Sequence, residues 1–447
     1  MFRKLLIANR GEVAVRVLQT CRRLGIQAVA VTTDADQDLS WLKDADEVVN
    51  LGDRRAYLDS DRLLDAAAQT SCSAVHPGWG FLSENPTFAA RCQADRLRFV
   101  GPSSASMRQM ADKAQARDTM RALGLPPVPG GEGVLDSPED AARFASEHGY
   151  PILLKAVAGG GGRGMRIVRS AGEVDAAFEA ATAEAVGGFG DGRLYVERLV
   201  ENARHIEFQI LSDGQNVQVL GERECSIQRR HQKLLEETPS PALAGESGAA
   251  LRERISAQVI HAVQALGYQG AGTIEMLLTP EGELYFMEMN TRLQVEHTVT
   301  EMVTGLDLVE AQLRIAANGP LPDAVSAQGH SIQCRINAES VSNDFRPAPG
   351  RLSKLVLPEG EGIRVDTHLR QGDPVSPHYD SLVAKVIAYG PDRATAIARM
   401  DAALATMVIE GVPSTIELHR SILAHPDFVA GRVTTGFLEQ ELERILS

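Results

Sequence analysis

Cysteine is scarce in this chain of 447 residues, and its spacing carries information. The five cysteines are odd in number, scattered and never arranged as a CxxC pair. This pattern indicates neither a disulfide framework nor a cysteine zinc site, so a reducing compartment fits best. Long apolar runs are also missing, since none approaches the roughly 18 residues of a membrane span. The opening MFRKLLIANRGEVA leads directly into a strand pattern instead of a signal or transit segment, and we expect a cytoplasmic protein.

Positive charge is the second shortage. The sequence has 45 Lys and Arg residues against 59 Asp and Glu residues, which gives a formal net charge of -14. A surface of this sign repels nucleic-acid phosphates and anionic lipids, so we expect no nucleic-acid partner and no membrane partner. With 44% hydrophobic and 23% charged residues, the composition is typical of a globular protein. The length suggests about three domains.

Strands and helices are predicted to alternate through the N-terminal part of the chain. The apolar segments that read as strands are 4–8, 26–32, 74–76 and 97–101. Repeated βαβ units of this kind predict a doubly wound parallel sheet. The dinucleotide fingerprint GxGxxG is absent from the first turn, which reads ANRGEVA, and a role in NAD binding therefore loses its main support.

A glycine-rich hairpin is predicted in the middle of the chain. A helix over about 104–123 leads into the hinge LGLPPVPGG, after which the strands ILLKAV and MRIVRS flank the loop AGGGGRG. This arrangement differs from the strand–loop–helix of a Walker motif, and the sequence contains no GxxxxGK[ST]. Between Leu194 and Met289, alternation predicts a two-sided antiparallel sheet, with His205, Glu207 and Gln209 opposite Ile206, Phe208 and Ile210. A linker over 317–328 precedes a last α+β unit.

The strongest geometric prediction concerns two glutamates in the hairpin GTIEMLLTPEGELYFMEMN. A turn centred on its EG pair places Glu275 directly opposite Glu288. Two facing carboxylates repel each other unless a cation lies between them, and oxygen ligands favour Mg²⁺ or Mn²⁺ over zinc. Side-chain alternation would continue this face to Asn290, Arg292 and Gln294. The alternative is an exposed polar strand face that binds no metal.

Lys155 and Lys113 are two further candidate residues. Lys155 lies in an apolar strand directly before glycines 159–162, where it would neutralise a phosphate while loop N–H groups donate hydrogen bonds. The alternative is a flexible surface hairpin. Lys113 lies off the apolar stripe of its predicted helix, which by itself is typical of a solvated face.

A basic cluster and a strand arginine complete the set of candidates. The segment RECSIQRRHQK would place Arg229, His231 and Lys233 on one face of a strand. They would either focus a positive field on a small anion or balance nearby glutamates on a solvated face. Arg335 lies on the polar face of the strand SIQCRIN, a position typical of the surface.

Taken together, six motifs resemble, in order and over essentially the whole chain, the biotin carboxylase component of biotin-dependent carboxylases of the acetyl-CoA carboxylase type. They are ANRGEVAVRV, HPGWGFLSEN, KAVAGGGGRGM, ECSIQRRHQK, MEMNTRLQVEH and QCRINAE. The resemblance implies an α/β and α+β fold in three parts. These are a Rossmann-like N-terminal domain over 1–111, an ATP-grasp domain over 112–318 with a mobile glycine-loop lid at about 128–199, and a C-terminal biotin carboxylase domain over 329–440.

The resemblance also implies a role for each candidate residue. The residues implied to bind ATP are Lys113, Lys155, Gly161, Gly162, Glu197, Arg198, Leu199, Val200, His205, Gln228 and His231. Those implied to hold two Mg²⁺ or Mn²⁺ ions are Glu275, Glu288 and Asn290. Those implied to bind bicarbonate are Lys233, Arg292, Gln294 and Val295, with Glu296 as the base that removes its proton. Arg335 is implied to steady the ureido oxygen of biotin.

The implied reaction is the ATP- and bicarbonate-dependent carboxylation of biotin through carboxyphosphate, the work of an ATP-dependent ligase that forms a C–N bond. It would be the first half-reaction of an acyl-CoA carboxylase, with fatty acid synthesis as the expected role. The sequence contains no AMKM-type biotin attachment motif, so we expect biotin on a separate biotin carboxyl carrier protein and a separate carboxyltransferase. The resemblance further implies a homodimer.

The sequence departs from the family pattern at two places, and two other functions stay open. Trp79 stands where the family more often has Tyr, and EETPSP follows Lys233 where EEAPAP is more usual. One alternative is another ATP-grasp ligase, such as a carbamoyl-phosphate or amino-acid ligase, which has no reason to carry QVEH or CRINAE. The other is a regulatory nucleotide-binding subunit without catalysis, which should have lost Lys233, Arg292, Glu296 and Arg335.

Overall fold

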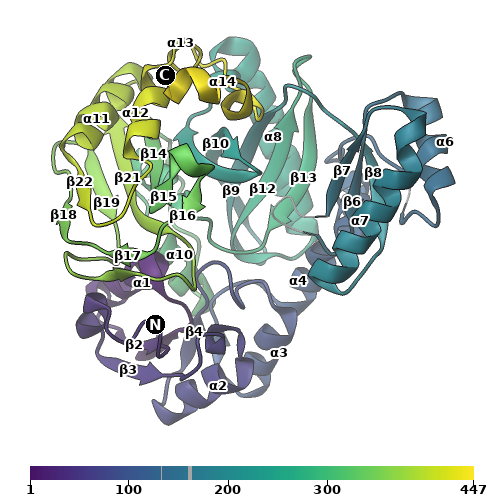
Figure 1. Cartoon of the computed structure of the whole chain (residues 1–447). Coiled ribbons are helices and arrows are strands. Elements are labelled where there is room, and N and C mark those ends of the chain that lie inside the picture. Colours follow the sequence, from purple (N-terminus) through teal and green to yellow (C-terminus); the bar gives the residue numbers. More distant parts are fainter. Residues whose placement is uncertain (132, 160–163, 447) are drawn as a thin grey trace.

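The computed structural model describes residues 1–131, 133–159 and 164–446. Three parts are distinct in space (Figure 1). The N-terminal part lies at the bottom of the view, a small three-stranded flap projects to the right, and a large sheet in the centre continues into the C-terminal helices at the upper left.

The N-terminal part is a five-stranded parallel sheet with the order β3-β2-β1-β4-β5. Its strands are β1 (Lys4–Ile7), β2 (Gln27–Thr32), β3 (Glu47–Asn50), β4 (Ala74–His76) and β5 (Arg98–Phe99). Its helices are α1 (Gly11–Arg23), α2 (Ser60–Gln69) and α3 (Pro86–Ala94). The predicted doubly wound parallel sheet is confirmed, and its central strands β1, β2 and β4 are almost wholly apolar because helices cover them.

The single helix predicted over 104–123 is wrong. The segment forms two helices, α4 (Ser104–Ala111) and α5 (Lys113–Ala122), with Asp112 in an extended conformation between them. The Asp112 side chain accepts the N–H of Gln115 at 3.0 Å and thereby caps α5. This break makes Lys113 the first residue of a helix instead of a mid-helix surface position.

The flap is a sheet with the order β7-β6-β8. It consists of β6 (Ile152–Ala156), β7 (Met165–Val168) and β8 (Leu194–Arg198), with helices α6 (Pro138–His148) and α7 (Val174–Phe189). The predicted hairpin of β6 and β7 is confirmed. Strand β8 was expected in the larger sheet but pairs with β6, because its residues share an apolar core with β6 and α6. Gly161 and Gly162 lie outside the described residues.

The large sheet has eight strands in the order β13-β12-β9-β10-β11-β14-β21-β19, and every pairing in it is antiparallel. Its first five strands in the sequence are β9 (Arg204–Asp213), β10 (Val217–Arg229), β11 (Gln232–Thr238), β12 (Gln269–Leu278) and β13 (Leu284–Asn290). The other three, β14 (His330–Asn337), β19 (Ile363–Asp366) and β21 (Leu382–Gly390), follow the predicted linker. The sheet therefore contains strands from before and after the linker, and residues from these two parts of the sequence lie on the same face of it.

The predicted alternation along β9 is confirmed. Ile206, Phe208 and Ile210 lie in an apolar core with residues of α8 (Gly245–Ala265). The opposite face, which carries Glu207 and Gln209, is also buried. The polar face of the sheet is therefore an internal site and not a solvated surface.

The β12–β13 hairpin places Glu275 opposite Glu288, as predicted. Nearer the turn, however, Met276 pairs with Phe286, one residue away from the simple expectation. Met287 is the extra residue of a β-bulge, which restores the predicted pairing at the two glutamates.

The C-terminal part covers one side of the large sheet with helices. They are α11 (Arg393–Thr406), α12 (Ile416–Ala424), α13 (Pro426–Val429) and α14 (Phe437–Leu446). Helix α14 lies near β10 at the top of the view (Figure 1). In the part of the chain that the structure describes, no helix combines the length and apolarity that a membrane span requires.

Candidate functional site

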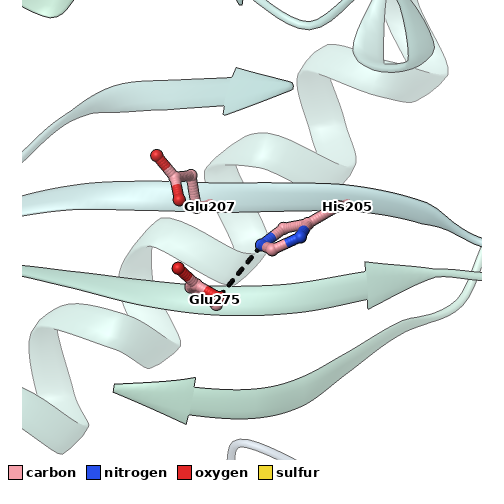
Figure 2. Close-up of side chains that lie close together, drawn as sticks. All are labelled: His205, Glu207 and Glu275. Carbon is pink, nitrogen blue, oxygen red and sulfur yellow. Dashed lines mark ion pairs between the residues drawn. The ribbon is translucent and has the colours of Figure 1, made fainter. Parts of the chain in front are cut away.

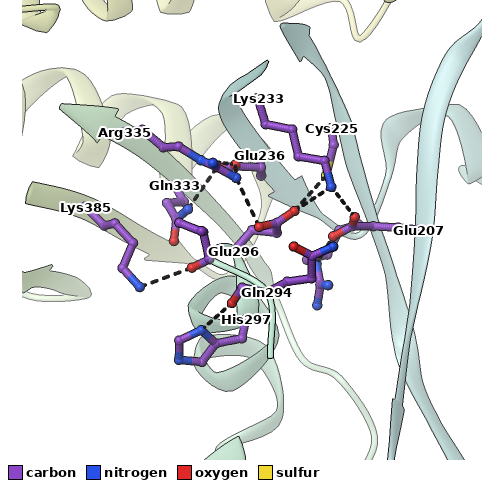
Figure 3. Close-up of polar contacts among 12 residues, drawn as sticks. Glu207, Cys225, Lys233, Glu236, Gln294, Glu296, His297, Gln333, Arg335 and Lys385 are labelled. Carbon is purple, nitrogen blue, oxygen red and sulfur yellow. Dashed lines mark hydrogen bonds and ion pairs between the residues drawn. The ribbon is translucent and has the colours of Figure 1, made fainter. Parts of the chain in front are cut away.

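Lys233 on β11 lies at the centre of a buried group of carboxylates. Its ammonium is 2.6 Å from Glu207 Oε2, 2.8 Å from Glu275 Oε1 and 2.6 Å from Glu296 Oε1. The carboxylates come from β9, from β12 and from the residue before α9 (His297–Thr304), so the fold brings three distant segments to one cation. Figure 3 shows Lys233 pointing at Glu207 and Glu296.

The charges of this group hold each other ionised. Burial alone lowers the pKa of Lys233, but the three carboxylates raise it well above its ordinary value. Burial alone raises the pKa of Glu296, but Lys233 and then Arg335 hold it well below the usual range. The pKa of Glu275 is likewise low, because Lys233 and His205 outweigh its burial. The site is therefore a set of preformed charges.

Glu296 joins the two halves of the large sheet. One of its oxygens accepts from Lys233, and the other accepts from Arg335 Nη2 at 3.0 Å. Arg335 on β14 also donates from Nε to Glu236 at 2.6 Å, and Gln333 donates to the second oxygen of Glu236 at 2.9 Å (Figure 3). The predicted surface position of an unassisted strand arginine does not hold for Arg335, because its guanidinium is part of this buried network.

The predicted shared strand face of Arg229, His231 and Lys233 is wrong. Arg230 and His231 both have positive φ, 49° and 63°, and form the two-residue turn between β10 and β11. The turn separates the cluster: Arg229 and Arg230 pair with Asp344, whereas Lys233 points into the carboxylate group. Of the predicted face, Lys233 alone belongs to the buried site.

Each of the two facing glutamates has a side-chain nitrogen close to one of its carboxylate oxygens. Lys113 Nζ lies 2.7 Å from Glu288 Oε2, an interaction that follows from the helix break at Asp112. His205 Nε2 lies 3.1 Å from Glu275 Oε2 (Figure 2). Asn290 Nδ2 donates to Glu275 at 2.8 Å, which leaves its oxygen on the side of Arg292. Two carboxylates and one amide oxygen at one place are hard ligands and fit Mg²⁺ or Mn²⁺.

Strand β13 ends at Asn290, so Arg292 and Gln294 are not on its face as predicted. They still return to it, because Arg292 Nη2 donates to Asn290 Oδ1 at 3.0 Å and Gln294 Nε2 donates to Glu275 Oε1 at 3.0 Å. Arg292 is further held by Glu84, whose Oε2 lies 2.8 Å from its Nε.

A pocket of about 320 Å³ opens beside these residues. Its polar lining includes Glu84, Lys113, Glu288, Asn290 and Arg292. The pocket therefore presents two cations and two of the candidate metal ligands, Glu288 and Asn290, to one space, as a phosphate-bearing substrate requires.

Among the residues that the structure describes, two groups of side chains have the spacing of metal ligands: His205, Glu207 and Glu275 (Figure 2), and Glu207, Cys225 and Glu296. The Lys233 ammonium already lies against the carboxylates of both groups. The lysine therefore supplies positive charge to these carboxylates, and neither group as a whole is assigned a metal. Glu275 is a candidate metal ligand only together with Glu288 and Asn290.

The flap contributes a second ionic cluster. The Glu197 carboxylate on β8 forms ion pairs with Lys155 on β6 and with Arg117 on α5. Sequence reasoning gave Glu197 only a backbone role and did not identify Arg117. The N–H groups of Arg198 and Leu199 donate to Pro129 and Pro151, at 2.8 and 3.1 Å, and are thus used within the protein.

Gln228 and His231, two of the remaining nucleotide candidates, lie at the end of β10 and directly after it. Gln228 Nε2 lies 2.7 Å from His205 Nδ1 and donates to the carbonyl of Cys225. His231 is exposed in the adjacent turn, and Val200 is half-buried at the end of the flap sheet. The carbonyl of Val295 accepts from Lys385 at 3.1 Å.

Sequence reasoning also missed Glu84 and Glu236 as site residues. Glu84 is the acid of the motif HPGWGFLSEN, and its contact with Arg292 spans more than two hundred residues. Glu236 is one of two consecutive glutamates in β11, and a fully buried charge on a strand requires a partner. Tertiary contact was the missing information in both cases.

Family models match three consecutive parts of the chain. The biotin carboxylase N-terminal domain matches residues 1–107, the ATP-binding domain of the carbamoyl-phosphate synthase L chain matches 112–324, and the biotin carboxylase C-terminal domain matches 333–440.

Relatives of similar length agree with these matches. A biotin carboxylase of Nostoc sp. is 49% identical over 446 residues, covering 98% of this chain and 99% of that protein. Biotin carboxylase 1 of Bacillus subtilis is 46% identical over 447 residues, covering 98% of each. The biotin carboxylase domain dimer of the Hydrogenobacter thermophilus 2-oxoglutarate carboxylase, solved with MgADP, ADP and bicarbonate, has a TM-score of 0.96 at 45% identity, covering 100% of this chain and 99% of that one.

Proposed function

The chain belongs to the biotin carboxylase family, and from that premise we propose which of its residues carry out the ATP-dependent carboxylation of biotin. The enzyme is an ATP-dependent ligase that uses Mg²⁺, bicarbonate and biotin. The observation that carries the assignment of residues is the position of Glu296 between Lys233 and Arg335. One carboxylate touches both the cation proposed for bicarbonate and the cation proposed for biotin.

In the first step, bicarbonate would lie against Lys233, Arg292 and the Gln294–Val295 backbone. Its proton passes to Glu296, and the freed oxygen attacks the γ-phosphorus of ATP, which releases ADP and forms carboxyphosphate. Attack of one anion on another requires charge neutralisation, and the cations that line the site would supply it. Lys113 and Lys155 would contact the phosphates of ATP.

The candidate metal ligands fit the ion that this step needs. Glu275, Glu288 and the amide oxygen of Asn290 would hold it, because all three present hard oxygen atoms on one hairpin. A bound Mg²⁺ or Mn²⁺ supplies charge neutralisation of the phosphate oxygens. Lys113 is paired with Glu288 in this structure, so the lysine would move from the carboxylate to phosphate when the nucleotide binds.

In the second step, the C–O bond of carboxyphosphate would break, the carboxyl would move to N1 of biotin, and the released phosphate would take up the N1 proton. Arg335 would stabilise the negative ureido oxygen of biotin during this transfer. Biotin N–H is a very weak acid, so stabilising its anion lowers the barrier of this transfer. We propose that the biotin is attached to a separate carrier protein, that separate carboxyltransferase subunits receive the carboxyl, and that the chain acts as a homodimer. The dimeric relative supports the last point.

We further propose an acyl-CoA as final acceptor, in fatty acid synthesis, and a cytoplasmic location. All five cysteines are free thiols, which supports a reducing compartment. Solved relatives include the biotin carboxylase parts of a pyruvate carboxylase and of a 2-oxoglutarate carboxylase, so the acceptor is best tested by assaying the complex that co-purifies with the chain.

The assignment is tested by separating the two steps with Arg335→Ser and Arg292→Ala. Bicarbonate-dependent ATP cleavage is assayed without biotin, and biotin carboxylation is assayed with it. Arg335→Ser should retain the first activity and lose the second by about a hundred- to a thousandfold, because the arginine faces a developing anion in a water-poor site. Arg292→Ala should lose both.

Loss of the biotin-free ATP cleavage in Arg335→Ser, as complete as its loss of carboxylation, would contradict this division. A different ATP-grasp ligase would instead cleave ATP with ammonia or an amino acid in place of bicarbonate. The matching flanking models of biotin carboxylase domains oppose that alternative.

A further inference from the structure

Lys385 is a completely buried lysine in an otherwise apolar strand, β21, and the reaction proposed above gives it no role. Its ammonium forms an ion pair with Glu12 Oε1 at 2.5 Å and donates to the carbonyl of Val295 at 3.1 Å. A carboxylate oxygen of Asp366 lies 3.6 Å away. The three oxygens come from the N-terminal part, the central part and the C-terminal part of the chain.

Burying an ammonium is costly unless each of its three protons finds an acceptor. A packed apolar side chain in β21 would avoid that cost, and buried ion pairs are often no more stable than such a replacement. The ion pair is therefore poorly explained by stability alone. Another explanation comes from the third contact of Lys385. Its ammonium donates to the carbonyl of Val295, which belongs to the proposed bicarbonate segment.

The sheet register places Lys385 directly beside Arg335, the arginine proposed to contact biotin. Arg335 on β14, Lys385 on β21 and Asp366 on β19 are Cα partners across three neighbouring strands. Two like charges at such a pair repel each other. Arg335 and Lys385 nevertheless lie side by side, and they contact consecutive residues of one segment. Arg335 donates to the side chain of Glu296, and Lys385 donates to the carbonyl of Val295 (Figure 3).

The segment is fixed on its other side by His297. The Nδ1 of His297 lies 2.7 Å from the carbonyl of Gln294 (Figure 3). Two successive carbonyls, those of Gln294 and Val295, are thus held by side chains. Movement of either would displace the Gln294 amide from Glu275 and the Glu296 carboxylate from Lys233.

We propose that Lys385 and Glu12 act as positioning residues for bicarbonate, by fixing the Val295 carbonyl and with it the backbone from Gln294 to Glu296. This inference rests on the proposed function, which places bicarbonate at that segment. It also gives a role to the turn ANRGEVA, whose Glu12 reaches from the N-terminal part to the ammonium of Lys385. Both residues act through the backbone and not by touching the proposed substrates.

The chain offers a matched control in Arg16, which lies on α1 one turn beyond Glu12. Arg16 is also buried, at 5% exposure, and it also crosses between parts of the chain, with Nη2 at 2.7 Å from Glu301 and 2.8 Å from Asp307. Its side chain donates to Thr20, Glu301 and Asp307, all of which lie outside the segment from Gln294 to Glu296. Arg16→Met therefore removes a buried inter-domain cation that makes no hydrogen bond to the segment from Gln294 to Glu296.

The experiment measures KM for bicarbonate and KM for ATP in Lys385→Met, Arg16→Met and the wild type. Lys385→Met should raise the KM for bicarbonate about tenfold or more, because the Val295 carbonyl loses its hydrogen bond from a charged donor. The KM for ATP should stay close to wild type, because this hydrogen bond fixes the proposed bicarbonate segment and not the proposed ATP contacts. Arg16→Met should leave the ratio of the two KM values unchanged. Glu12→Gln keeps the lysine and removes its charged partner, and it should give a smaller rise with the same selectivity.

Equal changes of both KM values in Lys385→Met, or a ratio that matches Arg16→Met, would overturn the positioning role. If Lys385→Met does not fold, an unchanged ratio in Glu12→Gln overturns it instead. A wild-type enzyme whose ATP cleavage ignores bicarbonate would overturn the proposed function itself, and that outcome is visible before any variant is compared.

Discussion

Replacing Lys233 by methionine tests the charge balance of the site most directly. The substitution keeps much of the side-chain volume and leaves Glu207, Glu275 and Glu296 without their shared cation. Removing one partner of a buried ion pair costs about 3–5 kcal/mol, because the remaining charge stays buried and unpaired. We expect a loss of unfolding free energy of that size at neutral pH, together with loss of bicarbonate-dependent ATP cleavage.

The pH dependence of that loss has a definite sign. In the wild type, the pKa values of Glu275 and Glu296 lie below their ordinary range, so their contribution to stability is present above about pH 4.5 and is lost as the pH falls further. Without Lys233, burial dominates and raises at least one of these pKa values above its unfolded value. That carboxylate then takes up a proton on folding, so acidification relieves the destabilisation.

The assay is urea unfolding followed by circular dichroism, from about pH 8 to about pH 5, on wild type and Lys233→Met. The difference in unfolding free energy between the two should shrink as the pH falls. Lys113→Met is the matched control, since its partner Glu288 is 32% exposed and the lysine itself 27%. Its cost should be about 1 kcal/mol or less. A Lys233→Met penalty that stays constant or grows on acidification would refute the reasoning.

Two further predictions concern the metal ligands and a buried histidine. Glu288→Gln should abolish Mg²⁺-dependent ATP cleavage and weaken Mn²⁺ binding measured by electron paramagnetic resonance, with little change in thermal midpoint. Glu283→Gln on the same hairpin is the control. Wild-type turnover by Glu288→Gln at saturating Mg²⁺ would contradict the assignment of Glu288 as a metal ligand. Burial lowers the pKa of His419 to about 4, so its contribution to stability is present above about pH 6.5 and is lost as the pH falls toward 4. In His419→Gln, the fall in unfolding free energy between about pH 6.5 and pH 4 should be smaller by about 3 kcal/mol at most. An unchanged dependence of the unfolding free energy on pH would contradict the lowered pKa of His419.

Local pattern was sufficient to predict the parts of the fold that depend on neighbours in the sequence. Alternation predicted which face of β9 enters the apolar core, and a single turn predicted that Glu275 faces Glu288. The register near that turn was nevertheless wrong by one residue, because a bulge at Met287 is not visible in an alternating pattern. The prediction placed the pairing next to the turn one residue away from its position and left out the bulge. These two errors compensate each other at Glu275 and Glu288, so that pair was predicted correctly.

Long-range burial was what the sequence did not reveal. Lys113 reads as a surface residue until Asp112 ends one helix and caps the next. Lys233 reads as one of several basic residues until the turn at Arg230 and His231 directs it inward. Their carboxylate partners lie from 26 to 175 residues away, a separation at which side-chain periodicity carries no information.

The network also joins the central part of the chain to the C-terminal part in one buried cluster. Glu236 and Glu296 are both completely buried, and burial raises the pKa of Glu236 above its usual range. Both carboxylates pair with Arg335 on β14, a strand that follows the linker. Without that strand, the central part would hold two buried carboxylates that lack the guanidinium they share. Arg335, which we propose to stabilise biotin, is therefore also the cation that these two buried carboxylates share, and under that proposal biotin entering the site would compete with Glu236 and Glu296 for it.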